Sequence, residues 1–137
     1  MQGYTIDQLE IGQKASFSKT VTETDIYLFA EITGDINPIH INREYAENSI
    51  FKDRIAHGML SAGFISAAIG VHLPGPGSIY SGQTLKFLAP VYIGDTVTAT
   101  VEIKEIFAEK GKVILTTTCS NQDGKTVLDG EATIVLR

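Results

Sequence analysis

Two residues of the kind that move protons in enzymes, Asp35 and His40, lie five positions apart in a polar stretch that contains Pro38. The proline fixes its own φ and restricts the residue before it, so this stretch has few conformations open to it. A carboxylate and an imidazole held beside one water molecule form a proton-transfer pair, because histidine titrates near neutral pH. Asp35 and His40 are therefore candidates for a general acid–base site, with Asn37 a candidate to orient the water or the loop.

The same spacing also has a purely structural explanation. Asp35 follows Gly34, which ends the preceding helical pattern, and an aspartate in that place is often a turn residue. A histidine beyond a proline is often hydrogen-bonded only within its own loop. Short motifs have a high false-positive rate, so spacing alone leaves both explanations open.

A second candidate feature is the pair His57 and Gly58, which opens an apolar segment. Amide groups in the first turn of a helix are unpaired and lie at the positive end of its dipole. The Gly58 amide can bind a developing oxyanion, and a glycine lets a carbonyl approach closely. The alternative is that Gly58 only starts the helix, and we interpret His57 as structural. Ser66 is either a small packing residue or a hydrogen-bond donor into a pocket beside this helix.

The N-terminal half of the chain contains the elements that must position the first candidate site. Residues 14–21 alternate in polarity and predict a first strand. The run Thr22–Asp25 matches a capping box, which predicts the start of a helix. We expect a polar loop over Asp35–His40, a brief helix capped by Asn42, and irregular chain over Ser49–His57.

The second half of the chain predicts one long helix and a sheet. From Gly58 to the break at Pro74–Gly77, apolar or small residues occupy nearly every face, which is typical of a helix buried all round. Strands are predicted at residues 79–87, 96–106, 113–119 and 126–136. Tight turns join them, so neighbours must run antiparallel. We predict an α+β fold in which a curved antiparallel sheet wraps around the long central helix.

Composition limits the class of protein. The 137 residues predict a single domain over residues 1–137, and the net charge of −5 argues against nucleic-acid and anionic-membrane surfaces. The least polar stretch, Gly58–Pro74, has about 17 residues, fewer than the roughly 20 that a membrane span needs. Cys119 is the only cysteine, and no Cys/His cluster has zinc spacing. The N-terminus lacks a signal-peptide pattern, so we expect a cytoplasmic protein without a metal site.

Several motifs resemble those of the MaoC-like, (R)-specific enoyl-CoA hydratases. The run GDINPIH at Gly34–His40 is similar to the hydratase 2 motif of that family. Further similar segments are His57–Leu60, Gly77–Tyr80 with Gln83, and Phe87–Asp95. Together they span about residues 8–136, nearly the whole chain.

The resemblance implies a hot-dog fold and the reversible addition of water to trans-2-enoyl-CoA, giving (R)-3-hydroxyacyl-CoA. By matching positions, Asp35 and His40 are the implied catalytic pair, Gly58 gives the oxyanion amide and Ser66 is a pocket serine. The substrate is an acyl-CoA and no cofactor is implied, because coenzyme A is part of the substrate. The implied assembly is a homodimer, as in the short hydratases that supply monomers for polyhydroxyalkanoate synthesis.

Two other functions share this fold class. One is a hot-dog acyl-CoA thioesterase, and the other is a non-catalytic module that binds acyl thioesters. Lys52 and Arg54 are candidates for the coenzyme A phosphates by position only, and we interpret them as solvated loop charges. Ile65 and Ile69 can bound an acyl pocket, but core packing is their expected role. Acyl chain length, the choice of acyl carrier and the base within the catalytic pair stay open.

Overall fold

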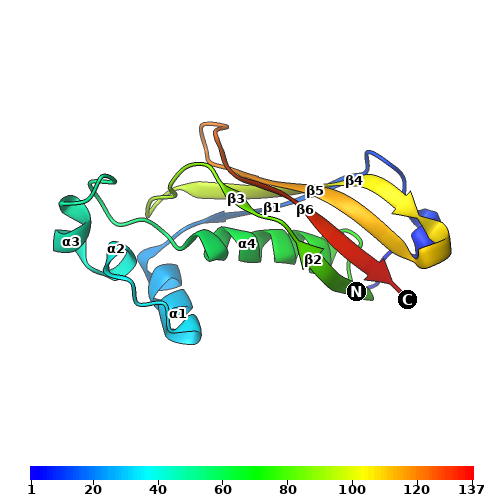
Figure 1. The fold of residues 1–137 in the computed structure, drawn as a ribbon, viewed down its shortest axis with the longest axis horizontal. Helices are drawn as coiled ribbons and strands as arrows, with labels where there is room; N and C mark the ends of the chain where they lie inside the picture. Colours follow the sequence, from blue (N-terminus) through cyan, green and yellow to red (C-terminus); the bar gives the residue numbers. More distant parts are fainter.

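A curved antiparallel sheet covers one long helix in the computed structural model, which describes residues 1–137 (Figure 1). The strands are β1 (Lys14–Thr20), β2 (Ser78–Gln83), β3 (Lys86–Phe87), β4 (Thr96–Phe107), β5 (Lys112–Ser120) and β6 (Thr126–Leu136). Their order across the sheet is β1-β4-β5-β6-β2, and the short β3 also pairs with β6. Every pair is antiparallel, which confirms the predicted α+β class.

The helices gather toward one end of the sheet. They are α1 (Glu23–Thr33), α2 (Pro38–Ile41), α3 (Arg43–Glu47) and α4 (Gly58–Ala67), which continues as a π-helical turn, η2 (Ala68–His72). Short 3₁₀ turns lie at η1 (Ile6–Gln8) and η3 (Ala108–Lys110). Figure 1 shows α1, α2 and α3 beyond the start of α4, with both chain termini at the opposite end. No helix is long and apolar enough to span a membrane.

The start and the end of α1 follow from local sequence, as predicted. The Thr22 hydroxyl accepts from the Asp25 amide at 3.1 Å, and the Asp25 carboxylate accepts from the Thr22 amide at 2.9 Å. At the other end Gly34 adopts φ 81°, a left-handed conformation that glycine enters without steric cost. Because both ends of α1 are fixed in this way, the position of Asp35, which follows Gly34, is fixed as well.

The predicted single strand over residues 79–87 is wrong, because the chain breaks there into β2 and β3. The pairing of β2 with β6 shifts register between Tyr80 and Gly82. The Thr84 carbonyl then lies so close to Gly130 that a Cβ at Gly130 would sit 1.9 Å from the carbonyl oxygen. This close approach to β6 lies between the two short strands.

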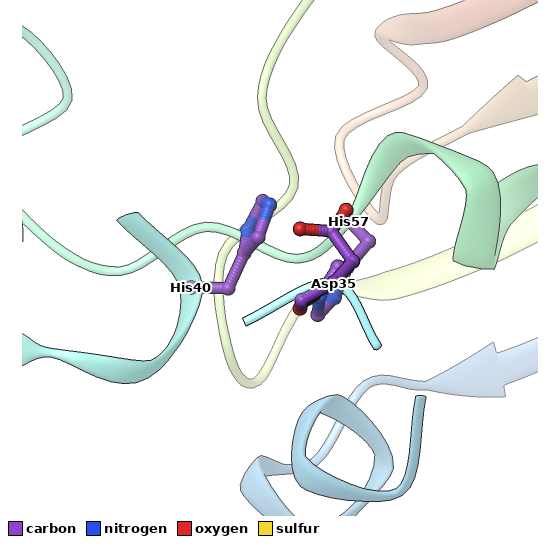
Figure 2. A group of neighbouring side chains, drawn as sticks. All are labelled: Asp35, His40 and His57. Carbon is purple, nitrogen blue, oxygen red and sulfur yellow. Dashed lines mark hydrogen bonds between the residues drawn. The ribbon is translucent and has the colours of Figure 1, made fainter. Parts of the chain in front are cut away.

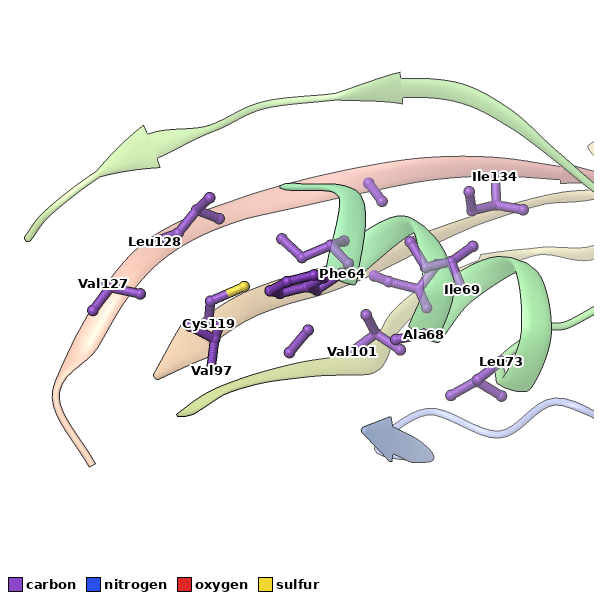
Figure 3. Close-up of a cluster of buried hydrophobic side chains, with 14 of the residues drawn as sticks. Phe64, Ala68, Ile69, Leu73, Val97, Val101, Cys119, Val127, Leu128 and Ile134 are labelled. Atoms are coloured by element: carbon purple, nitrogen blue, oxygen red, sulfur yellow. The ribbon is translucent and has the colours of Figure 1, made fainter. Parts of the chain in front are cut away.

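The helix α4 is buried on one face only, so the prediction of burial all round is wrong. Phe64 and Ile65 point into the sheet and are buried, whereas Met59, Gly63 and Ser66 are exposed. One sheet can cover only one side of a helix. Figure 3 shows Phe64, Ala68 and Ile69 of the helical segment packed toward side chains of the sheet. Ile69 and Ile65 belong to this core, as expected for packing residues.

Candidate active site

The chain from Asp35 to His40 is held by short-range hydrogen bonds. The Asp35 carboxylate accepts from the Asn37 amide at 3.3 Å, and the Asn37 side-chain oxygen accepts from the Ile39 amide at 3.1 Å. The second half of the predicted loop is therefore wrong, since α2 begins at Pro38. Asparagine at the N-cap and proline at the first helical position both favour a helix start. Asn37 thus acts on the loop, with its amide oxygen engaged in capping.

His40 is buried in α2 and is fixed by one backbone group. Its Nδ1 lies 2.7 Å from the Ile55 carbonyl oxygen, and because a carbonyl only accepts, Nδ1 carries the proton. In the neutral ring the Nε2 lone pair is then free. Burial lowers the pKa of His40 below the usual 6.5, more than the bond to Ile55 and the charge of Asp35 raise it. The imidazole is therefore neutral at pH 7 and able to accept a proton.

His57 joins this pair, although its sequence context indicated only a structural role. Its ring stacks on His40 with centroids 3.8 Å apart, and its Nε2 donates to the Asp35 backbone carbonyl at 2.9 Å. Asp35, His40 and His57 each offer one atom within 4.8 Å of the others. Figure 2 shows the three side chains meeting between α2 and the start of α4. Nothing in a single sequence reveals this stacking, because the residues come from separate segments.

Two of the nitrogen atoms in this trio are already engaged by backbone groups. An imidazole binds a metal ion in the plane of its ring, at about 2.0–2.1 Å for zinc. The rings of His40 and His57 are stacked, and their planes differ by 28°. His40 Nδ1 and His57 Nε2 are also occupied by carbonyl groups. This arrangement suits proton transfer better than metal coordination.

Gly58 opens α4 beside the two histidines. No side chain caps the helix at His57, and the Gly58 amide has no acceptor within the chain. A Cβ at Gly58 would lie 2.5 Å from Cε1 of Phe87, so the aromatic ring packs directly on the glycine. The helix start therefore offers an unpaired N–H at the positive end of its dipole, which suits an anionic oxygen.

Two hollows lie beside the start of α4. One has a volume of about 430 Å³, is mostly apolar and contains His40, His57 and Gly58. The other, of about 610 Å³, is a more open groove that contains Asp35 and Ser66. Met59 lines both hollows. The structure thus brings Asp35, His40 and Gly58 together, and it places Ser66 on the exposed face of α4 in the groove of Asp35.

The prediction that Arg54 is a solvated loop charge is wrong. The residue is 3% exposed, and its guanidinium donates to Glu23 and to the Tyr27 hydroxyl, both on α1. This burial could not be predicted from the sequence, since Glu23 and Tyr27 lie far from Arg54 along the chain. Lys52, by contrast, is exposed and has a positive φ of 64°.

Comparison with known proteins identifies the family of the chain. The family described as MaoC like domain matches residues 7–124. The chain belongs to this MaoC-like family. An (R)-specific enoyl-CoA hydratase from Rhodospirillum rubrum is 56% identical over 130 residues, covering 95% of this chain and 90% of that protein.

Solved structures of MaoC-like relatives share the fold. An R-hydratase from Pseudomonas aeruginosa in the unliganded form matches with a TM-score of 0.93 and 48% identity, covering 98% of this chain and 86% of that one. The (R)-hydratase from A. caviae involved in PHA biosynthesis matches with a TM-score of 0.91 and 42% identity, covering 94% and 98%. The hot-dog fold expected from the sequence motifs is confirmed for this MaoC-like chain.

Proposed function

We propose that this chain is an (R)-specific enoyl-CoA hydratase, which adds water reversibly to trans-2-enoyl-CoA and gives (R)-3-hydroxyacyl-CoA. One observation carries the proposal. A neutral His40, with Nδ1 engaged and Nε2 free, lies within 4.8 Å of the Asp35 carboxylate and beside the unpaired amide of Gly58. Hydration needs these groups, namely a base for water and a donor for the thioester oxygen. Names of relatives at 56% and 42% identity support the same activity.

The proton balance of the reaction fits the pair. Water loses one proton to the pair Asp35 and His40 as its oxygen bonds to C3, and the C2=C3 electrons move toward the thioester oxygen. The protonated pair then returns that proton to C2 as the thioester carbonyl re-forms. The free Nε2 makes neutral His40 able to accept the first proton, and Asp35 beside it stabilises the resulting cation. A coupled pair of this kind shares the proton between its members.

The Gly58 amide supplies the second requirement. Negative charge develops on the thioester oxygen when water attacks C3, and an N–H at a helix start stabilises that charge before the reaction begins. Loss of one such donor typically costs about 2.7–4 kcal/mol of barrier. Ser66 and Asn37 complete the proposed substrate-binding set, with Ser66 in the groove beside Asp35 and Asn37 holding the loop. No resident cofactor enters this scheme, since coenzyme A arrives as part of the substrate.

We also propose a homodimer. Met59, Gly63 and Ser66 form an exposed face on the central helix, and Ile79 and Tyr80 of the edge strand β2 are 47% and 39% exposed. Edge strands and apolar helix faces of this kind favour pairing with a second copy. Sedimentation velocity tests this assembly, and a fully active monomer contradicts it.

A single assay separates hydration from the alternatives. With crotonyl-CoA and pure protein, we expect enoyl absorbance to fall without release of free thiol. Free thiol indicates a thioesterase, and binding without either change indicates a non-catalytic module. The chirality of the product tests the (R) assignment, and enoyl-CoA and enoyl-acyl-carrier-protein substrates of increasing length define the acyl range. The role of the A. caviae relative makes supply of PHA monomers the proposed pathway, and a cytoplasmic location stays a prediction.

A further inference from the structure

The irregular segment Phe51–His57 contains a buried cation, Arg54, that the proposed chemistry does not use. Arg54 is 3% exposed, yet it precedes two residues that touch the site. Ile55 supplies the carbonyl that accepts from His40, and His57 stacks on the same ring. The position of this segment therefore sets the environment of His40.

All the side-chain partners of Arg54 lie on α1. Its Nη2 is 2.9 Å from Glu23 Oε2, and its Nη1 donates to the Tyr27 hydroxyl at 2.9 Å. The guanidinium carbon also lies 5.7 Å from the centre of the Tyr27 ring. Two hydrogen bonds and one aromatic contact thus tie the segment before Ile55 to a rigid helix.

The segment is also tied to its other neighbours, since the Tyr92 hydroxyl donates to the Phe51 carbonyl at 2.9 Å and Ile55 forms an isolated antiparallel bridge with Tyr92. The Ile55 amide donates to the Ile39 carbonyl at 3.3 Å, near the long limit for a hydrogen bond, and the Ala56 amide donates to Val91 at 2.7 Å. The Ala56 amide shares a peptide plane with the Ile55 carbonyl, so its bond to Val91 helps to orient that carbonyl, but none of these bonds reaches α1. The guanidinium of Arg54 supplies the clamp that ties this segment to α1.

Stability alone is a poor explanation for the buried guanidinium. Removing a cation from water carries a large desolvation penalty, and apolar residues of similar volume often stabilise a fold equally well. The Nε atom of Arg54 is also buried without a partner, which adds to that cost. What the clamp contributes is a defined geometry between α1 and the segment that contacts His40.

We propose that Arg54 is a positioning residue that holds the Ile55 carbonyl against His40 Nδ1. The contact keeps the neutral imidazole in the Nδ1–H tautomer, with Nε2 free toward the site. When the clamp is released, the carbonyl moves and His40 also adopts the Nε2–H tautomer, in which Nε2 cannot accept a proton from water. The tautomer part of this inference concerns the free protein, and its effect on rate rests on the proposed hydratase function.

The direct test is ¹⁵N NMR of the imidazoles above pH 7. The chain has 3 histidines, so His40→Gln and His57→Gln variants assign the signals, with exposed His72 as reference. We expect a single Nδ1–H tautomer for His40 in the wild type and a mixture in Arg54→Met, which keeps the apolar stem. Arg54→Lys keeps a charge for Glu23 and is expected to restore part of the wild-type signal. Lys104→Met breaks the exposed pair with Glu131, neither of which lines the two hollows of the site, and serves as the control.

Kinetics provide the second measurement. In Arg54→Met we expect kcat to fall about tenfold to a hundredfold with KM nearly unchanged, as is typical of a misplaced catalytic group. An unchanged tautomer in Arg54→Met overturns the proposal. If Arg54→Met does not fold, a double variant of its two half-exposed partners, Glu23→Gln with Tyr27→Phe, replaces it in the test. The same mixture of His40 tautomers and the same fall in kcat are expected. A shifted tautomer in a protein that hydrates no enoyl thioester supports the positioning role and refutes the hydratase function instead.

Discussion

The imidazole rings of His40 and His57 are stacked, with centroids 3.8 Å apart and planes inclined by 28°. Protonation of His40, which is buried, places a cation against the face of a second imidazole. Burial contributes most to the lowered pKa of His40, and the neighbouring His57 lowers it further. The stack therefore favours the neutral, proton-accepting form of His40.

The pH dependence of hydration follows from this relationship. Neutral His40 accepts a proton, so activity is lost as pH falls through its pKa, which lies below the usual 6.5. We expect the acid limb of kcat/KM to be centred below pH 6.5, since this parameter reports the free enzyme. Initial rates on crotonyl-CoA from pH 4.5 to 8 measure it, with stability checked at each pH. A limb centred above 6.5 contradicts the assignment of His40.

Replacing His57 separates its two contacts. His57→Phe keeps an aromatic ring on His40 but loses the donor to the Asp35 carbonyl, whereas His57→Gln keeps a donor and loses the ring. Since His57 lowers the pKa of His40, the acid limb is expected to move to higher pH in both variants. Release of the Asp35 backbone is expected to lower kcat about a hundredfold in His57→Phe, and less in His57→Gln. Equal kcat in the two variants would show that the bond to Asp35 has no catalytic effect.

The catalytic pair is tested by changes that preserve local hydrogen bonds. Asp35→Asn retains an oxygen for the Asn37 amide, and His40→Gln retains an N–H donor for Ile55. Both variants are expected to fold, and each is expected to lose about 10²–10⁴-fold in kcat because general acid–base catalysis contributes that much. Circular dichroism and thermal melting serve as controls for folding. Near-wild-type turnover in either variant refutes the assignment.

Local signals explain why much of the fold was predictable. The capping box at Thr22 and the left-handed Gly34 depend on neighbours within four positions, so the bounds of α1 were visible in the sequence. The alternation of apolar and polar residues along β4 likewise predicted which side chains are buried. That Asp35 and His40 lie together was also predictable, because only five positions separate them.

Long-range contacts explain what the sequence did not reveal. The burial of Arg54 depends on Glu23 and Tyr27, which lie 31 and 27 positions away. At the break between β2 and β3, Thr84 lies close to Gly130 on another strand. Such pairings leave no periodic pattern, so composition and spacing predicted a solvated arginine and one continuous strand.

The last prediction concerns Gly58, where packing and catalysis must be separated. In Gly58→Ala the new Cβ would lie 2.5 Å from Phe87 Cε1, which forces the ring to move. Phe87 is 53% exposed, so the ring can swing outward, and we expect a stability loss toward the lower end of the roughly 1–3 kcal/mol typical of overpacking. The added methyl group also blocks the approach of the thioester oxygen to the helix start. A large fall in kcat/KM is therefore expected, although the amide itself is retained.

The double variant Gly58→Ala with Phe87→Leu distinguishes the two effects. The smaller side chain relieves the clash, so the free energy of unfolding in urea is expected to return toward that of Phe87→Leu alone. Activity is expected to stay low, because the methyl group still occupies the place of the substrate oxygen. Recovery of both stability and kcat/KM in the double variant would mean that Gly58 serves only to accommodate Phe87, and the oxyanion role of its amide would then have to be abandoned.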